Sequence, residues 1–534
     1  MTLRKSIFLV FLLTLGTSFA QYPTFRLHPS DTNQIEPSIV VHPSNPQILF
    51  SSAFTIKGAA LREGVYVTTN GGQSWYGMDR IIEQLTTRHG GDPGPLIDKN
   101  GTFILTHRGN EAGGWWSNNS TDNGINWAVS VPIFSSPEDV DKGSANTDTE
   151  PSSTNYGRSY LVWTRFTAPY PILISYTTNS GTSWSSYIQI NNSLSTGHYS
   201  IGPCITIGTS GQVYVAWAAS VISGVEDRIG FAVSSNGGLN WSVQESVYDV
   251  NGIKTQQLSP WTIRANGYPV IDVDRTGGSR HGWIYIITGE KNLAPAGSDP
   301  DIIFHRSTNG GVNWSSGVRV NQDPLNNGKV QFFPAVNVDA GGGINVVYYD
   351  NRNSADSVEV FISRSTDGGN MWTDYLISNH KFKPSSAGGG NNMGDNLGIT
   401  SANGNLYPVW MDNKVNPGIF QVLCAIVNYT TIGVKKISSE VPEKFQLKQN
   451  FPNPFNPVTK IKFDVPSKVK SETSNVKIIV YDIIGREISI LVNEELKSGS
   501  YEVTFDGANL PSGAYYYRLT TDEYTETRKM VLLK

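Results

Sequence analysis

The sequence predicts an all-β protein in which a seven-bladed β-propeller precedes a small immunoglobulin-like β-sandwich. Two patterns support this prediction: an eight-residue motif that recurs six times, and several short runs of alternating polarity near the C-terminus. Composition agrees, because the 534 residues include 53 glycines and 11% aromatic residues but only 16% charged residues. Many short, aromatic-rich strands joined by glycine turns give this balance. The length allows two or three domains.

Residues 1–20 have the pattern of a secretory signal peptide. Two basic residues at 4–5 precede an apolar run at 7–15, which is too short to span a bilayer. Small residues at positions 18 and 20 suit signal peptidase, so we expect cleavage before Gln21. A membrane anchor is the alternative interpretation. The sequence contains no other transmembrane candidate.

The recurring motif has Ser or Thr first, Asp or Asn third, Gly fifth and Trp eighth. The polar side chain at position three can accept backbone N–H groups across a tight turn. Glycine tolerates positive φ, and the Trp ring can pack on a neighbouring sheet. The motif therefore predicts a hairpin that fastens two outer strands. Its occurrences are Thr68–Trp75, Ser120–Trp127, Thr177–Trp184, Ser234–Trp241, Ser307–Trp314 and Ser365–Trp372.

Each motif lies within a longer unit that predicts four antiparallel strands. In one unit, strands are expected at 334–338, 344–349 and 358–363, with a fourth strand after the Trp. Four strands in about 50–65 residues are typical of a propeller blade. Counting motifs gives six blades, which is the fallback. Counting unit starts gives seven, at Pro37, Pro93, Pro151, Pro203, Pro269, Pro334 and Asn396.

The last unit lacks a fourth strand, and a segment near the N-terminus is expected to supply it. Residues 396–428 predict three strands without the motif and without a fourth strand. Residues 24–28 (TFRLH) precede the first unit and resemble the fourth strands of other units, such as 317–321 (GVRVN). We therefore expect residues 24–28 to pair with the last unit, which removes an exposed sheet edge. The predicted propeller spans residues 21–431.

The motif is the Asp-box, and its recurrence resembles the BNR-repeat, sialidase-like propellers. That resemblance implies a ligand site where the inner strands converge at one mouth of the channel. True sialidases clamp the sialic-acid carboxylate with three arginines, and use a Tyr–Glu pair and an acid/base Asp. Residues 25–29 (FRLHP) are similar to the first arginine motif but have an extra residue before the proline. The start of the best-matching blade, Phe333-Pro334, has no arginine, and 50–55 contains no acid. No Tyr–Glu pair can be assigned.

Charged residues at strand ends are the candidate site. In an antiparallel pair the start of one strand lies beside the end of the next, so these side chains should crowd one face. We expect substrate binding by Glu36, Asp92, Asp395, Arg108, Arg165 and Arg352. The candidate catalytic acids are Glu150, Glu290 and Asp350. Crowded carboxylates shift each other's pKa, and arginines bind anions. The alternative is a mixed-charge rim that lines the channel.

The C-terminal part begins after a predicted linker at 432–444, which has no periodicity. Prolines at 452, 454 and 457 predict an extended entry segment. The domain at 445–534 then has strand-like alternation in five runs, at 459–465, 476–482, 501–505, 514–520 and 527–533. A β-sandwich of about 90 residues fits this pattern.

Four segments of this domain resemble the type A sorting domain of the type IX secretion system. They are NFPNPFNP at 450–457, VYDIIGRE at 480–487, LPSGAYYYRL at 510–519 and KMVLLK at 529–534. The resemblance implies that the type IX machinery is a partner and that its outer-membrane translocon recognises this tail. It also implies a Gram-negative bacterium, and a mature protein that is released or held at the cell surface.

The sequence predicts no metal and no cofactor, with calcium as the open alternative. Residues 272–277 match the first half of a calcium loop, but position twelve of that pattern is Trp283 instead of an acid. Cys204 and Cys424 lie in separate apolar strands, so we expect two separate thiols. No Cys/His group has zinc spacing.

Three functions fit these observations. The first is a glycan-active, sialidase-like glycoside hydrolase at the cell surface. The second is a non-catalytic propeller that binds carbohydrate or protein, and the third is a structural surface protein. The net charge of −4 gives no indication of a nucleic-acid or anionic-membrane partner. A glycan is the candidate ligand.

Overall fold

The computed structural model is built from strands. The described residues are 22–81, 88–191, 197–221, 224–254, 257–387, 392–416, 418–429, 434–438, 440–467, 473–507 and 510–534. Within these ranges there is no α-helix, and therefore no helix long and apolar enough to cross a membrane. The expected signal peptide lies outside the described residues. The all-β prediction is confirmed.

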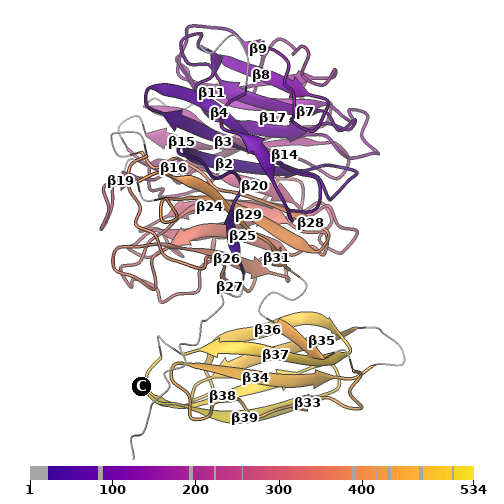
Figure 1. Cartoon of the computed structure of the whole chain (residues 1–534), viewed down its shortest axis with the longest axis vertical. Helices are drawn as coiled ribbons and strands as arrows, with labels where there is room; N and C mark the ends of the chain where they lie inside the picture. Colours follow the sequence, from indigo (N-terminus) through magenta and orange to yellow (C-terminus); the bar gives the residue numbers. More distant parts are fainter. Residues whose placement is uncertain are drawn as a thin grey trace, which may run out of the picture.

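The larger domain contains seven sheets in which antiparallel strands follow one another outward from an inner strand (Figure 1). The first three are β2 (Asn33–Val41), β3 (Leu49–Lys57), β4 (Ala60–Thr68), β5 (Tyr76–Met78); β6 (Gly94–Ile97), β7 (Phe103–Arg108), β8 (Trp115–Ser120), β9 (Val131–Phe134); and β10 (Val140–Thr147), β11 (Ser159–Arg165), β12 (Ile172–Thr177), β13 (Ile188–Gln189).

The next three sheets are β14 (His198–Ile207), β15 (Val213–Val221), β16 (Glu226–Ser234), β17 (Ser242–Asp249); β20 (Val270–Val273), β21 (Ile284–Glu290), β22 (Asp301–Ser307), β23 (Val318–Arg319); and β24 (Gln331–Val338), β25 (Ile344–Asp350), β26 (Glu359–Ser365), β27 (Thr373–Leu376). The seventh contains β28 (Gly398–Ala402), β29 (Asn405–Asp412), β30 (Gln421–Ala425), β31 (Val427–Asn428) and β1 (Thr24–Arg26). A hairpin of β18 (Gln257–Leu258) and β19 (Ile263–Arg264) is inserted before β20.

The inner strands close into a ring, as in a β-propeller. Each of β2, β6, β10, β14, β20 and β24 packs against the next, and β28 packs against β2. β1 pairs with β30, with Thr24 opposite Ala425 and Arg26 opposite Leu423. The expected pairing of the N-terminal strand with the last unit is therefore confirmed. This pairing covers the edge that β30 would otherwise expose.

The six octapeptides form one kind of turn, each between the third and fourth strands of its sheet. The hydroxyl at position one accepts a hydrogen bond from the glycine N–H at 2.8–3.1 Å. The side chain at position three accepts the N–H of position seven at 2.9–3.1 Å. The glycine has positive φ in all six turns. The predicted turn chemistry is therefore present.

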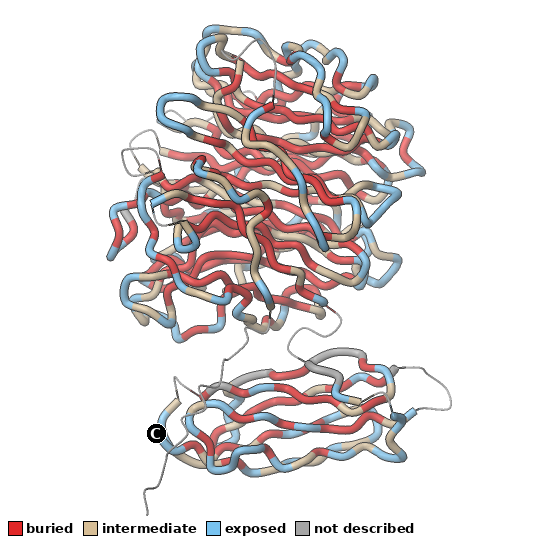
Figure 2. Tube along the Cα trace, in the orientation of Figure 1, coloured by how far each residue is buried: buried red, intermediate tan, exposed pale blue. Residues whose placement is uncertain are grey.

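The hydrophobic core lies between neighbouring sheets, and Figure 2 shows buried strand centres beneath exposed turns. The Trp of one sheet reaches a Phe of the sheet before it. Ring centroids are 5.7 Å apart for Trp127 and Phe50, and 5.3 Å apart for Trp372 and Phe304. Such aromatic contacts fasten consecutive sheets to each other.

One predicted unit start is wrong. Pro151 follows the inner strand β10 and lies in the loop to β11 instead of at the start of a strand. The other prolines lie in or directly before an inner strand. β10 has Gly143 where β2 and β24 have a proline, so counting prolines selected the wrong segment.

The C-terminal domain consists of two sheets that enclose a separate core. One contains β32 (Val434–Ser438), β33 (Gln446–Leu447), β34 (Val458–Val465) and β37 (Gly499–Asp506). The other contains β35 (Thr473–Tyr481), β36 (Glu487–Lys497), β38 (Gly513–Thr520) and β39 (Thr525–Leu532). Residues 434–438, expected in a linker, form an edge strand on β37. The five-residue strand is too short for its alternation to stand out.

Leu27 offers a test of ring closure. Its side chain is 2% exposed in a cluster formed by the first and last sheets, and its N–H donates to Val422 O at 3.0 Å. We expect Leu27→Ala to lower the free energy of unfolding by about 2–5 kcal/mol, as buried leucines do. Urea unfolding of the full chain measures this. Leu239→Ala, at a 49% exposed turn position, is the control. Equal stability of both variants would contradict the closure.

Candidate functional site

The starts of the inner strands have an unusual backbone that repeats around the ring. β2, β10, β14 and β24 each have a register shift near the N-terminal end. At or near the starts of four inner strands, a non-glycine residue has left-handed φ directly before a proline or glycine: Glu36 (55°), Asp92 (51°), Lys142 (52°) and Phe333 (53°). β-bulges redirect side chains, and strained residues of this kind gather at functional sites.

Three of these four residues meet where the starts of neighbouring inner strands converge. Lys142 Nζ lies 2.6 Å from Asp395 Oδ2, 3.3 Å from Asp92 Oδ1 and 4.0 Å from Glu36 Oε1. The four side chains come from the starts of four different sheets. Asp141 precedes Lys142, and its charge acts on the same group. We call Glu36, Asp92, Asp141, Lys142 and Asp395 the mouth cluster.

Burial and charge separate the protonation states within the mouth cluster. Burial raises the pKa of Glu36 to about 8 although Lys142 opposes it, and raises that of Asp141 to about 7. Burial also acts to raise the pKa of Asp395, but Lys142 and Arg264 hold it below the ordinary value. The site thus offers a protonated Glu36 carboxyl group near the ionised Asp395 carboxylate at neutral pH, the combination that general acid–base chemistry uses.

Burial alone would lower the pKa of Lys142, but the carboxylates around it, Asp395 first, raise it well above its ordinary value. The ammonium therefore stays charged at any physiological pH. Four acids around a single cation would repel one another if all were ionised. The retained protons on Glu36 and Asp141 relieve this repulsion.

Two arginines form the exposed rim of the mouth cluster. Arg264 Nη2, from β19, lies 3.1 Å from Asp395 Oδ2, and its side chain is 45% exposed. Arg108 Nη1, at the end of β7, lies 3.5 Å from Asp141 Oδ1 and is 39% exposed. Asn266 Nδ2 donates to Asp395 O at 3.0 Å. The inserted hairpin thus supplies part of the site.

In the three remaining inner strands, the residue directly before the proline is uncharged: Gly202, Tyr268 or Phe333. Tyr268 precedes β20, and its ring lies so close to Gly202 that a Cβ there would come within 2.4 Å of the ring. Phe333 is 1% exposed and packs in one cluster with Trp261 of the hairpin. Trp261 Nε1 donates to Asp356 O at 2.7 Å, which fastens the hairpin to the loop after β25. These three positions thus carry no charge, in contrast to Glu36, Asp92 and Lys142.

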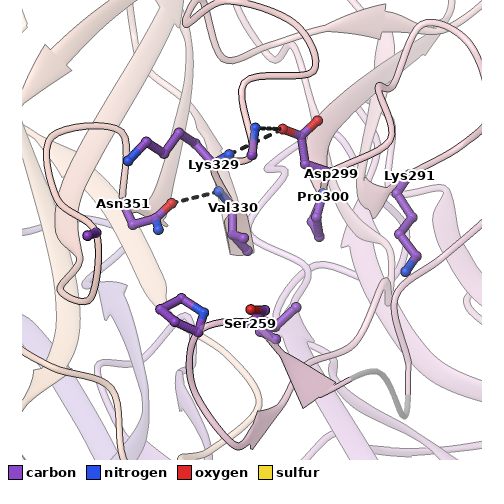
Figure 3. A pocket seen from close by; sticks show the side chains of 11 residues that line it. Ser259, Lys291, Asp299, Pro300, Lys329, Val330 and Asn351 are labelled. Atoms are coloured by element: carbon purple, nitrogen blue, oxygen red, sulfur yellow. Dashed lines mark hydrogen bonds between the residues drawn. The ribbon is translucent and has the colours of Figure 1, made fainter.

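A pocket of about 390 Å³ lies beside the turn of the hairpin (Figure 3). Its lining includes Ser259, Lys291, Asp299, Lys329 and Asn351. Several polar side chains of the pocket make hydrogen bonds to the backbone of the surrounding loops. Asp299 Oδ2 accepts the N–H of Gly328 at 2.6 Å, and Asn351 Oδ1 accepts that of Val330 at 2.7 Å. Lys329 Nζ donates to Ser354 O at 2.8 Å. The volume suits a small ligand.

Four of the expected binding residues, Glu36, Asp92, Asp395 and Arg108, do come together at the mouth. The expected position of Glu150 is wrong. It lies in the loop after β10, at the opposite end of the inner strand, where its Oε1 is 3.7 Å from Arg275 Nε. The cause is the misassigned unit start at Pro151.

Arg165 and Glu290 lie at the ends of second strands without an ion pair to the mouth cluster. Arg165 Nη2 lies 3.1 Å from Glu138 Oε1. Glu290 is 2% exposed and accepts a hydrogen bond from Thr288 Oγ1 at 2.5 Å. Burial raises the pKa of Glu290 to about 7.

Asp350 and Arg352 belong to a buried ion network instead of an open clamp. Arg352 Nη2 lies 2.6 Å from Asp350 Oδ2, and its Nη1 lies 2.5 Å from Asp374 Oδ2. The guanidinium also lies over the Phe361 ring at 4.4 Å. Burial raises the pKa of Asp350 to about 6, although Arg352 opposes this. With its donors engaged by these carboxylates, Arg352 fastens β25 to β27.

Sequence reasoning missed Asp141, Lys142 and Arg264. Asp141 and Lys142 lie in a strand (VDKGSANT) with one apolar residue at its start, and Arg264 lies in a two-residue strand. A usable signal did exist for Lys142. It precedes a glycine at the position where Glu36 and Asp92 precede a proline.

One group of described residues has metal-ligating side chains close together. The ligand atoms of Glu63, His89 and His107 lie within 4.8 Å of one another, and all three residues are buried. His89 Nδ1 contacts Glu63 Oε2, and the two imidazole rings are stacked at 4.4 Å with 14° between their planes. The carboxylate and the two stacked rings thus form one buried polar group.

The segment that matches the first half of the calcium-loop pattern makes internal contacts. Asp272 Oδ1 lies 2.8 Å from Arg275 Nη1, and Asp274 Oδ1 accepts the N–H of Thr276 at 2.9 Å. These contacts make a strand turn with an internal ion pair. Cys204 and Cys424 are both free thiols, as expected.

Comparison with known proteins identifies the tail. Residues 449–533 match the family of secretion system C-terminal sorting domains, so this protein carries the signal of an exported protein. No curated protein matches the chain.

Several solved structures resemble the chain at low identity. A polysaccharide lyase, the PL25 ulvan lyase, has a TM-score of 0.47 and 13% identity over 74% of this chain and 94% of the lyase. A protein of unknown function from Dyadobacter fermentans has a TM-score of 0.40 and 12% identity over 65% and 98%. An α-L-arabinofuranosidase from Fusarium graminearum has a TM-score of 0.39 and 11% identity over 64% and 93%.

Glu36 gives the mouth cluster a pH signature. Because its folded-state pKa of about 8 exceeds the ordinary 4.5, the folded state holds a proton that the unfolded state loses. This contribution to stability is complete below pH 4.5 and is lost as pH rises to about 8. The free energy of unfolding should therefore decline as pH rises. We expect Glu36→Gln to reduce the slope of this decline by up to about 1.4 kcal/mol per pH unit, the limit for one proton. Melting temperatures from pH 4.5 to 8.5 measure this, with exposed Glu443→Gln as control. Parallel curves for wild type and Glu36→Gln would contradict it.

Proposed function

We propose that this protein is a glycan-binding, seven-bladed β-propeller of the Asp-box type, exported through the type IX secretion system. Its sandwich, of the immunoglobulin-like kind, serves as the sorting domain. The mature protein then acts at the surface of a Gram-negative bacterium or in its surroundings. The single observation that carries the binding proposal is the mouth cluster with its two exposed arginines.

The chemistry of the mouth suits a polyhydroxylated ligand. Asp92 and Asp395 offer acceptors, while Arg264 and Arg108 offer donors at the rim. Sugar hydroxyls donate and accept at once, so they pair with both kinds of group. Hydrogen bonds to charged groups are the stronger ones, which gives such a site affinity for neutral sugars.

The arginines support binding more than sialidase activity. Arg108, Arg165, Arg264 and Arg352 form ion pairs with different carboxylates. A sialidase clamp needs three guanidinium groups free to meet one ligand carboxylate. Arg352 in particular is 11% exposed and engaged by Asp350 and Asp374.

A specific observation supports glycoside hydrolysis as the second candidate function. Glu36, with a pKa of about 8, is suited to donate a proton, and Asp395, with a lowered pKa, is suited to act as base or nucleophile. Lys142 bridges them at 4.0 and 2.6 Å, so the facing oxygens are at most about 6.6 Å apart, within reach of a two-carboxylate mechanism.

The experiment is a glycan-array screen of the full chain, combined with fluorogenic glycosides that include a sialoside. We expect array binding that Arg264→Gln weakens at least about tenfold, the size of one charge-assisted hydrogen bond. Arg486→Gln, a 74% exposed arginine of the C-terminal domain, is the matched control and should bind like wild type.

Two results would contradict the binding proposal: no glycan bound by the full chain, or binding that Arg264→Gln leaves unchanged. Turnover of a glycoside that Glu36→Gln abolishes would make the second candidate the function. Turnover of the sialoside would contradict our interpretation of the arginines.

A further inference from the structure

Three aromatic side chains gather beside the mouth cluster, on the next part of the rim. Tyr199, at the start of β14, lies 6.0 Å by ring centroids from Phe166 and 6.0 Å from Tyr170, with interplanar angles of 54° and 62°. Phe166 and Tyr170 belong to the loop that follows β11. All three residues are partly buried, and Phe166 and Tyr199 also pack against the core between the sheets of β14 and β20. We call the three residues the aromatic group.

The aromatic group is joined to the mouth cluster through β10. Phe166 N donates to Asp139 O at 2.9 Å, and Arg165 is opposite Val140 in the sheet. Asp139 is two residues from Asp141, a separation of at most about 7 Å along an extended chain. One sugar unit of a bound chain spans a similar length. The two sites are thus neighbours along one side of the mouth.

The backbone of the loop is held in a strained form that presents a ring. Tyr170 has φ of 58°, a left-handed value that is unfavourable for a bulky residue, and its N–H donates to Thr167 O at 2.9 Å. Strain of this kind persists where the surroundings over-determine it, and it gathers at ligand sites.

Charged groups flank the rings. The Lys254 ammonium contacts the Tyr199 hydroxyl and lies 4.8 Å from its ring centroid. Lys254 is itself anchored, because its N–H donates to Glu226 Oε2 at 2.9 Å. On the other side, Arg165 and Glu138 form a half-exposed ion pair next to Phe166. Rings with polar groups at their margin match a pyranose, which has apolar C–H faces and a hydroxyl edge.

We infer that Phe166, Tyr170 and Tyr199 form a second sugar subsite, which stacks on a pyranose of the same chain that enters the mouth cluster. This inference rests on the proposed function and deepens it. The ligand class becomes an oligosaccharide of two or more units instead of a single sugar. Arg165 and Lys254 contact the hydroxyl edge of the stacked unit.

Calorimetry of the full chain with defined oligosaccharide ladders tests the subsite. The probes are β-1,4-linked glucose and α-1,4-linked galacturonate oligomers of one to five units. We expect at least one ladder to gain affinity from one to three units. Tyr170→Ala should remove that gain, about five- to tenfold for the trimer, and leave the monomer unchanged.

Two control variants keep the test clear of folding effects. Tyr170→Phe retains the ring and should bind the trimer like wild type. Tyr187→Ala removes a 44% exposed tyrosine directly before β13, the outer strand of the sheet that contains β11. This variant should also bind the trimer like wild type. Equal melting temperatures establish that each variant is folded, and Phe166→Leu replaces Tyr170→Ala if that variant does not fold.

The outcomes separate the subsite from the mouth. Binding that Arg264→Gln weakens, but that neither chain length nor Tyr170→Ala changes, would overturn the subsite alone. Loss of monomer affinity in Tyr170→Ala would overturn it as well. If neither ladder nor any array glycan binds, the proposed function fails and the subsite fails with it.

Discussion

One ammonium group, from the sheet of β10, holds together carboxylates from three other sheets. The Lys142 side chain is 12% exposed, and its three carboxylate partners are 7–10% exposed. Removing these charges from water costs several kcal/mol for each ion, and mutual attraction offsets the cost only when the geometry is good. Lys142 satisfies this condition because a bulge with left-handed backbone directs it toward these carboxylates. The ring and the site therefore depend on the same contact.

The charge balance also explains why the carboxyl groups of the mouth cluster differ in their pKa values. The acids outnumber the cations, so burial leaves Glu36 and Asp141 protonated while Asp395 stays ionised. A ligand that offers both donors and acceptors can replace some of these internal contacts. Arg264 and Arg108 are exposed beside the mouth cluster. Arg352, by contrast, is buried in ion pairs with neighbouring aspartates. The same residue type is thus exposed beside the mouth cluster at two positions and enclosed in an ion network at a third.

The sequence was most informative where the physics is local. Each octapeptide turn closes through hydrogen bonds within eight residues, so Thr68 or Ser307 could be assigned without knowing the rest of the chain. The pairing of β1 with β30 was predictable because the last unit lacked one strand. Glu36, Asp92 and Asp395 were found because each lies at or near the start of an inner strand that could be recognised.

The remaining features depend on contacts that sequence patterns do not record. Glu150 was expected at the start of an inner strand, but Lys142 occupies that position. The start of β10 was missed because it has Gly143 where other inner strands have a proline. Arg264 reaches the mouth from a two-residue strand of an inserted hairpin, which has no periodicity to detect. The enclosure of Arg352 by Asp374 depends on the fourth strand of its sheet, 22 residues away.

A double-mutant cycle between Lys142 and Asp395 tests the central contact most directly. Lys142→Met alone should lower the free energy of unfolding by about 3–5 kcal/mol, because it leaves buried carboxylates uncompensated. Adding Asp395→Asn should recover part of this loss, with a coupling energy above about 1 kcal/mol. Additive effects within about 0.5 kcal/mol would contradict the view that this ammonium holds the mouth together.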